Sequence, residues 1–190
     1  MEASQPQTLP GREPVGGRLL LVGVIGAAVA LTLGIYASAH TPASDLSITL
    51  GFTNTITMKV WLATIAIAFA LVQVLTAMWL YGRLPLRSAP SWLGRVHRIS
   101  GRLAFIISLP VAYHCLYQLG FQHSSARVLA HSILGCAFYG AFAAKVMVVR
   151  SPRLPGAALP LAGALAFTVL VCVWLTSGVW YISNSGFPSP

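Results

Sequence analysis

Five apolar stretches of about 20 residues constrain this chain more than any other feature of its sequence. They cover residues 19–38, 60–81, 99–119, 128–149 and 159–182. A helix needs about 20 predominantly apolar residues to cross the hydrocarbon core of a bilayer. None of the stretches alternates polar and apolar residues as a barrel strand would. The sequence therefore predicts an all-α integral membrane bundle of five transmembrane helices, which together occupy residues 18–183.

The composition agrees with this prediction and argues against a nucleic-acid-binding protein. Hydrophobic residue types make up 56% of the chain, and charged types make up 8%, against about a quarter in soluble domains. The formal net charge is +9, but the basic residues lie in short clusters between the apolar stretches. This placement is typical of cations that orient membrane helices, so the expected partner is the lipid bilayer and not nucleic acid.

The distribution of basic residues predicts the orientation. Cytoplasmic loops carry an excess of Lys and Arg. If the amino terminus is cytoplasmic, the outer side holds Lys59 and Arg127. The cytoplasmic side then holds Arg12, Arg18, Arg83, Arg87, Arg95, Arg98, Arg102, Lys145, Arg150 and Arg153. We therefore expect a flexible cytoplasmic tail over residues 1–17 and a short extracytoplasmic tail over residues 184–190. Richness in Ala, Pro and Arg suits a high-GC bacterium, and hence a multi-pass protein of the bacterial cytoplasmic membrane.

Two histidines within the apolar stretches are the main functional candidates. Ionisable side chains inside a membrane span are costly and usually functional. His114 and His131 are placed symmetrically about the predicted loop at 119–127, so they should lie level on antiparallel helices. Two level imidazoles suit a metal ion between them, above all haem iron with two axial nitrogens. Gly135, one turn beyond His131, would let a flat ring approach the helix. Two alternatives remain open: histidines hydrogen-bonded to each other or to carbonyl groups, and a proton or ion relay.

A second group of candidates lies at the cytoplasmic end. His97 opens the third stretch beside Arg98 and Arg102. Lys145 lies within about 40° of the helix face that holds His131. We expect these residues to form an interfacial basic cluster that contacts lipid head groups, haem propionates or a quinone, with Lys145 reaching towards the head groups. A solvated interface histidine is the alternative for His97. Gln73, in the middle of the second stretch, is expected to hydrogen-bond a neighbouring helix, with a quinone oxygen as the alternative partner.

Three segments also carry a family resemblance. They are the segment from His97 to Arg102 (HRISGR), the segment from Pro110 to Cys115 (PVAYHC) and the segment from His131 to Gly135 (HSILG). Together they resemble the small membrane-embedded b-type cytochromes of the cytochrome b(561) and ferric-reductase-like superfamily. The chain is particularly similar to a group of uncharacterised actinobacterial membrane proteins of similar length. The resemblance covers residues 92–150 and implies haem b held by histidines from transmembrane helices, with His114 and His131 in the ligand positions.

These observations lead to one functional prediction and two alternatives. The chain is expected to be a b-type cytochrome subunit with one haem b, and two haems are the alternative. It would carry electrons between a quinone or another inner donor and an extracytoplasmic redox partner. It contains no catalytic-residue motif, so we expect an electron-transfer component of an oxidoreductase and not a self-contained enzyme. The predicted metal ligands are His114 and His131, and the predicted cofactor contacts also include His97, Gly135, Arg98, Arg102 and Lys145. The alternatives are a haem-free scaffold subunit of a larger membrane complex and a small transporter or proton channel.

Overall fold

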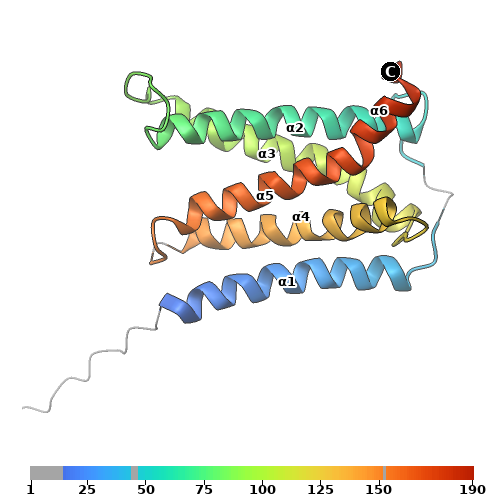
Figure 1. Ribbon diagram of the computed structural model, residues 1–190, viewed down its shortest axis with the longest axis horizontal. Helices are drawn as coiled ribbons and strands as arrows, with labels where there is room; N and C mark the ends of the chain where they lie inside the picture. The colour runs from blue at the N-terminus through green and yellow to red at the C-terminus, as the bar shows by residue number, and fades with distance from the viewer. Residues whose placement is uncertain (1–14, 44–46, 152) are drawn as a thin grey trace, which may run out of the picture.

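The computed structural model describes residues 15–43, 47–151 and 153–190. Two of its helices, α3 and α5, continue directly into π-helical segments, and a short helix, α6, ends the bundle (Figure 1). The elements in chain order are α1 (Val15–Ala39), α2 (Thr55–Leu80), α3 (Leu93–Tyr113), η1 (His114–Gln118), α4 (Ala126–Arg150), α5 (Ala158–Trp174), η2 (Leu175–Val179) and α6 (Trp180–Ser185).

The predicted all-α class is confirmed, with five helices of the length and composition that a membrane span requires and no strand in the described ranges. Several helices extend past the predicted boundaries. For example, α2 begins at Thr55 because the Asn54 side chain caps it, accepting from the amides of Ile56 at 3.0 Å and Thr57 at 2.9 Å.

Helices extend into both of the segments that the sequence predicts to be tails. Residues 1–14 of the predicted cytoplasmic tail lie outside the described residues, while residues 15–17 already belong to α1. At the other end, α6 continues through Ser185 into the predicted tail at 184–190. At both ends, the helical backbone hydrogen bonding continues into residues outside the apolar stretches.

The helices form two groups with α5 between them. The closest backbone neighbours are α2 with α3, α1 with α4, and α4 with α5, and α5 also approaches α2. Although α3 and α4 follow each other in the chain, their backbones hardly approach. Figure 1 shows α2 and α3 together on one side and α4 and α1 on the other. The backbones of α3 and α4 are therefore not closely packed, although the sequence predicts that these two antiparallel helices bring His114 and His131 level with each other.

Aromatic side chains fill the middle of the space between α3 and α4. Phe105 stacks on Phe142 with ring centroids 4.2 Å apart and meets the edge of Tyr139 at 5.9 Å. The Tyr139 hydroxyl donates to the Ser108 carbonyl at 3.1 Å and lies 2.9 Å from the Ser108 hydroxyl. These rings connect the two helices and also keep their backbones apart.

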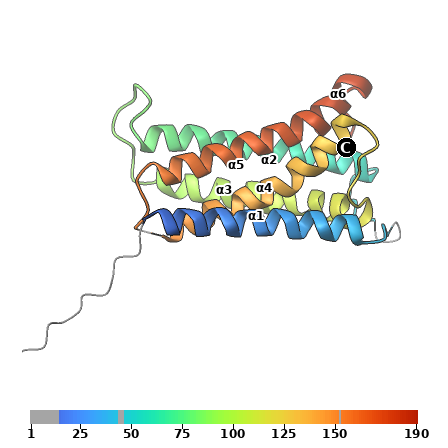
Figure 2. The same ribbon diagram turned by 60° about the horizontal axis from the view of Figure 1, so that its bottom comes forward.

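The packing of α1 depends on small residues. α1 lies on the outside of the bundle against α4 (Figure 2). A Cβ added to Gly26 would lie 2.9 Å from the Gly140 carbonyl oxygen and 3.1 Å from the Ala144 Cβ. Small residues at such contacts let two membrane helices approach closely.

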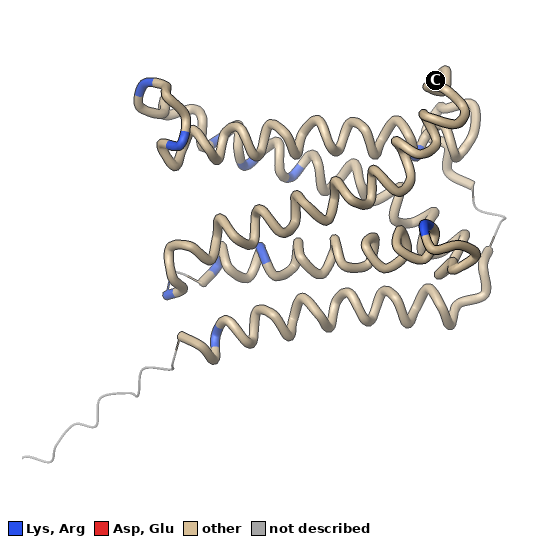
Figure 3. The backbone as a smooth tube through the Cα atoms, in the orientation of Figure 1, with Lys and Arg blue, Asp and Glu red and all other residues tan. Residues whose placement is uncertain are grey.

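The basic residues separate towards the two ends of the bundle (Figure 3). Lys59, near the start of α2, and Arg127, near the start of α4, lie at the end where the chain finishes, which we call the distal end. The opposite, basic end lies where α1 begins. It holds Arg18, Arg83, Arg87, Arg95, Arg98, Arg102, Lys145, Arg150 and Arg153.

Replacing Gly26 by Leu is expected to lower the free energy of unfolding by about 1–3 kcal/mol, because the new side chain would meet the backbone of α4. Reversible unfolding in mixed detergent micelles would measure this change. Gly23→Leu is the matched control, since nothing lies within 4 Å of a Cβ at Gly23. Equal losses in the two variants would contradict the proposed close contact.

Candidate functional site

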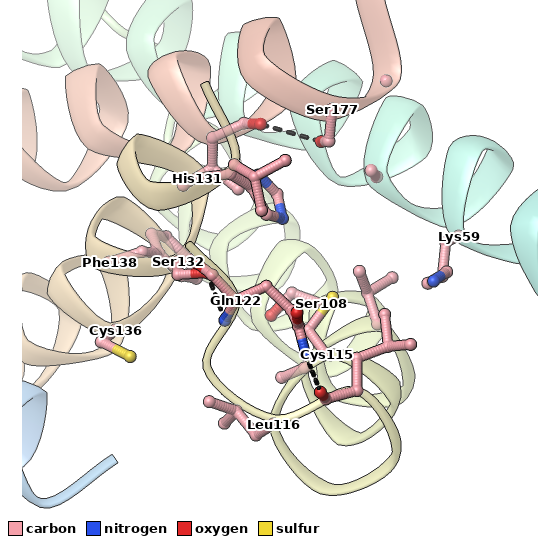
Figure 4. A pocket seen from close by; sticks show the side chains of 18 of the residues that line it. Lys59, Ser108, Cys115, Leu116, Gln122, His131, Ser132, Cys136, Phe138 and Ser177 are labelled. Atoms are coloured by element: carbon pink, nitrogen blue, oxygen red, sulfur yellow. Dashed lines mark hydrogen bonds between the residues drawn. The ribbon is translucent and has the colours of Figure 1, made fainter. Parts of the chain in front are cut away.

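A cavity of about 400 Å³ opens at the distal end, between α2, α3, α4 and α5 (Figure 4). Its walls are mostly apolar, and ligand pockets of this kind usually measure about 300–1,000 Å³. The polar or ionisable side chains among the lining residues are those of Lys59, Ser108, Cys115, Gln122, Arg127, His131, Ser132, Cys136, Tyr139, Ser177 and Tyr181. The cavity is therefore suited to a largely apolar ligand that also carries a few polar groups.

Both π-helical segments form part of the cavity wall. Cys115 and Leu116 of η1 face it from one side, and Ser177 and Gly178 of η2 face it from another. A π-helical turn holds an extra residue, which widens the helix and changes the direction of the side chains that follow. Such turns inside α-helices occur frequently at functional sites.

One face of α4 presents three successive turns to the cavity. Arg127, His131 and Gly135 are spaced four residues apart and all line it, so they lie about 6 Å apart along the helix axis. A Cβ added to Gly135 would have no atom within 4 Å. The sequence prediction that Gly135 leaves room beside His131 is consistent with this open space.

The His131 imidazole has one nitrogen bonded and the other available. Its Nδ1 lies 3.2 Å from the Thr176 hydroxyl oxygen, and this hydroxyl reaches the carbonyls of Cys172 and Val173, each at 2.9 Å. A Thr176 hydroxyl that donates to one of these carbonyls can accept from Nδ1–H, and in that tautomer the lone pair of the ring lies on Nε2. Figure 4 shows the ring projecting into the cavity. A histidine that binds a metal is commonly fixed by such a bond from its second nitrogen.

His114 does not line the cavity. It is 1% exposed, its Nε2 lies 2.7 Å from the Ile48 carbonyl oxygen, and its Nδ1 contacts the Gln118 amide oxygen. The positions of the two histidines about the loop predict that their imidazoles face each other. In the structure they do not. The helices that carry them are held apart by aromatic rings, and η1 begins at His114, whose ring points towards the loop before α2 instead of towards α4.

Two cations give the cavity a positive character. The Arg127 guanidinium lies 3.7 Å from the centre of the Trp180 ring, and its Nη1 donates to the Thr176 carbonyl at 2.6 Å. Lys59 lines the same space, and no hydrogen bond or ion pair holds it within the described ranges. All three acidic residues of the chain, Glu2, Glu13 and Asp45, lie outside the described residues. The two cations at the lining favour a ligand with anionic groups.

The predicted cluster at the basic end forms in part, far from the cavity. Lys145 donates to the Gln73 amide oxygen at 3.2 Å, so the prediction that Lys145 reaches towards the head groups is wrong. Gln73 donates to the His97 carbonyl and, at 3.2 Å, to the Ser100 hydroxyl, which confirms its predicted role between helices. His97 Nδ1 lies 2.9 Å from the Thr76 hydroxyl.

The two arginines of the predicted cluster take no part in this network. Arg98 and Arg102 are exposed. Gly101 makes the network possible, because a Cβ at this position would lie 2.8 Å from the Gln73 side chain. His97, Arg98, Arg102 and Lys145 therefore lie at the basic end, whereas Gly135 and His131 line the cavity at the distal end.

Sequence reasoning missed three contributors to the distal site. Lys59 and Arg127 were used only to predict the orientation, yet a signal was present: each lies close to the start of an apolar stretch, apart from the other ten basic residues. Thr176 gave a weaker signal as a hydroxyl in the fifth apolar stretch. Its role depends on η2, which sets which side chains face α4.

The fold and the site define a helical protein with five potential membrane spans and an amphipathic cavity at one end. The chain belongs to the family of unknown function DUF6529, whose model matches residues 19–189. No curated protein and no solved structure matches the chain.

Replacing Gln73 by Leu is expected to lower the free energy of unfolding by about 1–2 kcal/mol, because Lys145, Ser100 and the His97 carbonyl all lose a partner. A double-mutant cycle with Lys145→Met in detergent micelles would measure the coupling. We expect the double variant to be less destabilised than the sum of the single variants. Strict additivity would contradict a direct bond between Gln73 and Lys145.

Proposed function

We propose that this protein is a membrane b-type cytochrome that holds haem b in the distal cavity, with His131 as an axial ligand. The observation that carries the proposal is the His131 ring, which projects into an apolar cavity with its Nδ1 fixed by Thr176. A neutral imidazole with a free Nε2 is a usual ligand of haem iron. The proposal includes a relationship to the cytochrome b(561) and ferric-reductase-like superfamily.

The other residues of the cavity also suit haem. A porphyrin is flat and apolar, and the wall beside His131 is apolar and opens above Gly135. Haem also carries two carboxylates, which Lys59 and Arg127 would attract at the cavity lining. The predicted pair of axial ligands fits less well, since both ring nitrogens of His114 are already bonded to other groups. The residues present thus fit a haem held through one histidine.

Bound haem would supply one-electron transfer, while the protein binds the group, orients it and limits its contact with water. His131, oriented by Thr176, would hold the group, and the apolar walls would lower the polarity around it. The proposed partners are a quinone or another inner donor and an extracytoplasmic redox partner. On this proposal the Lys145–Gln73–His97 network faces the donor side, because it lies at the basic end.

The proposed orientation follows from the separation of the charges. The basic end is placed in the cytoplasm by the positive-inside rule, which puts the amino terminus inside and the cavity near the outer surface of the bacterial cytoplasmic membrane. Haem at this depth would lie close to an outer redox partner and far from the cytoplasm. The supporting observation is that nine of the described basic residues lie at one end, with Lys59 and Arg127 at the other.

The haem proposal predicts a coloured protein. After purification in mild detergent from haem-replete cells, it should show a Soret band that shifts on reduction with dithionite. His131→Ala should remove at least nine-tenths of this band, because the cavity loses its metal ligand. His123→Ala is the matched control, since His123 is an exposed loop residue outside the cavity. Colourless wild-type protein would refute the proposal and favour the haem-free scaffold.

The orientation can be tested separately with single cysteines. In a variant whose Cys115, Cys136 and Cys172 are replaced by Ala, Ser88→Cys should be protected from a membrane-impermeant maleimide in intact cells. Ser124→Cys, at the distal end, should be labelled. Both serines are exposed, so accessibility in the folded protein does not limit either reaction. The reverse labelling pattern would show that the cavity faces the cytoplasm.

A further inference from the structure

We infer that His114 fastens the loop before α2 to the end of α3 and would not bind the iron of a haem held by His131, so that such a haem would take no histidine from α3 and could accept a small uncharged ligand. This inference rests on the proposed function, because it concerns the second axial position of the same group. Carbon monoxide, nitric oxide and dioxygen are the class of ligand that such an open position takes.

The first argument is the hydrogen bonding of His114. Its Nε2 is 2.7 Å from the Ile48 carbonyl oxygen in the loop, and its Nδ1 contacts Gln118 one turn further along. At 1% exposure, the ring is among the most deeply buried polar groups of the protein. Turning it into the cavity would break both contacts and expose a ring that now packs inside the protein.

The second argument is the stack of aromatic rings around His114. Tyr113 packs its edge against His114 with ring centroids 5.4 Å apart, and it stacks on Tyr117 at 5.3 Å. Tyr117 stacks on His40 at 4.6 Å, and His40 stacks on Tyr36 of α1 at 5.1 Å. This stack joins α1, the start of the loop and η1 into one packed unit. The His114 ring is therefore held from several directions, not by its hydrogen bonds alone.

The third argument is what α3 and η1 do present to the cavity. Their lining residues are Ser108, Val111, Ala112, Cys115 and Leu116, with no imidazole among them. The Cys115 sulfur, next to His114 in the sequence, is the one group in this set that could bind iron. The wall opposite His131 is otherwise apolar and small, which suits an uncharged diatomic ligand better than an ionised one.

The experiment uses the purified full-length protein and carbon monoxide as the probe. Haem with an open position binds carbon monoxide after reduction, so the Soret band of dithionite-reduced wild-type protein should shift and sharpen when the gas is added. Haem whose two axial positions are both filled by histidine should change little. We expect the wild type to respond fully at micromolar gas concentrations.

Two substitutions at His114 separate ligation from the role in the loop. The amide of His114→Gln can still donate to the Ile48 carbonyl but should not replace a histidine on iron, so we expect wild-type haem content and an unchanged response to carbon monoxide. His114→Ala should keep its haem and speed hydrogen exchange in residues 47–54 by at least tenfold. Cys115→Ala controls for the neighbouring sulfur and should respond as the wild type does.

The outcomes distinguish this inference from the proposed function. A haem-loaded wild type that ignores carbon monoxide, while His114→Gln or His114→Ala binds it, would show that His114 is the second ligand and would overturn the inference alone. A response that appears only in Cys115→Ala would also overturn it, because the sulfur would then fill the position. Colourless wild-type protein would overturn both proposals.

Discussion

The contact between α3 and α4 determines where this bundle is packed and where it is hollow. Aromatic side chains make the contact, so the two helix backbones do not approach each other closely. Phe105, Tyr139 and Phe142 meet midway along the two helices and hold their axes apart. Towards the basic end, the gap is bridged by Gln73 on α2, which donates to the His97 carbonyl of α3 and accepts from Lys145 of α4. Towards the distal end nothing comparable fills it, and the cavity results. In lipid the hydrophobic effect gives little drive to close such a space, so packing geometry decides where it stays open.

Much of the architecture could be predicted from the sequence, because bilayer thickness fixes the length of an apolar helix. The five spans and their approximate limits follow from this one constraint. Helix ends are less predictable, since caps such as Asn54 add turns outside the apolar stretch. The pairing of helices was not predictable: α3 and α4 are joined by a short loop, yet each packs mainly against other helices.

The site was predictable only in part, for a related reason. His131 and Gly135 could be placed together because they lie four residues apart on one helix. The direction of His114 could not be predicted, because helical periodicity assumes 3.6 residues per turn and η1 departs from it at that residue. Lys145 was misjudged for a different reason. Its partner, Gln73, lies 72 positions earlier in the chain, so no local pattern relates the two.

The close approach of Gly26 and Gly140 has a consequence for how the protein is made. The two glycines are separated by 114 residues (140 minus 26), and translation adds roughly 5–20 residues per second. After α1 leaves the ribosome, its principal partner is therefore absent for roughly 6–23 s. During this interval α1 must wait in the bilayer or beside the insertion machinery, and its largely apolar, exposed surface suits such a delay. Assembly of the native bundle is completed when α4 arrives beside the helix that was synthesised first.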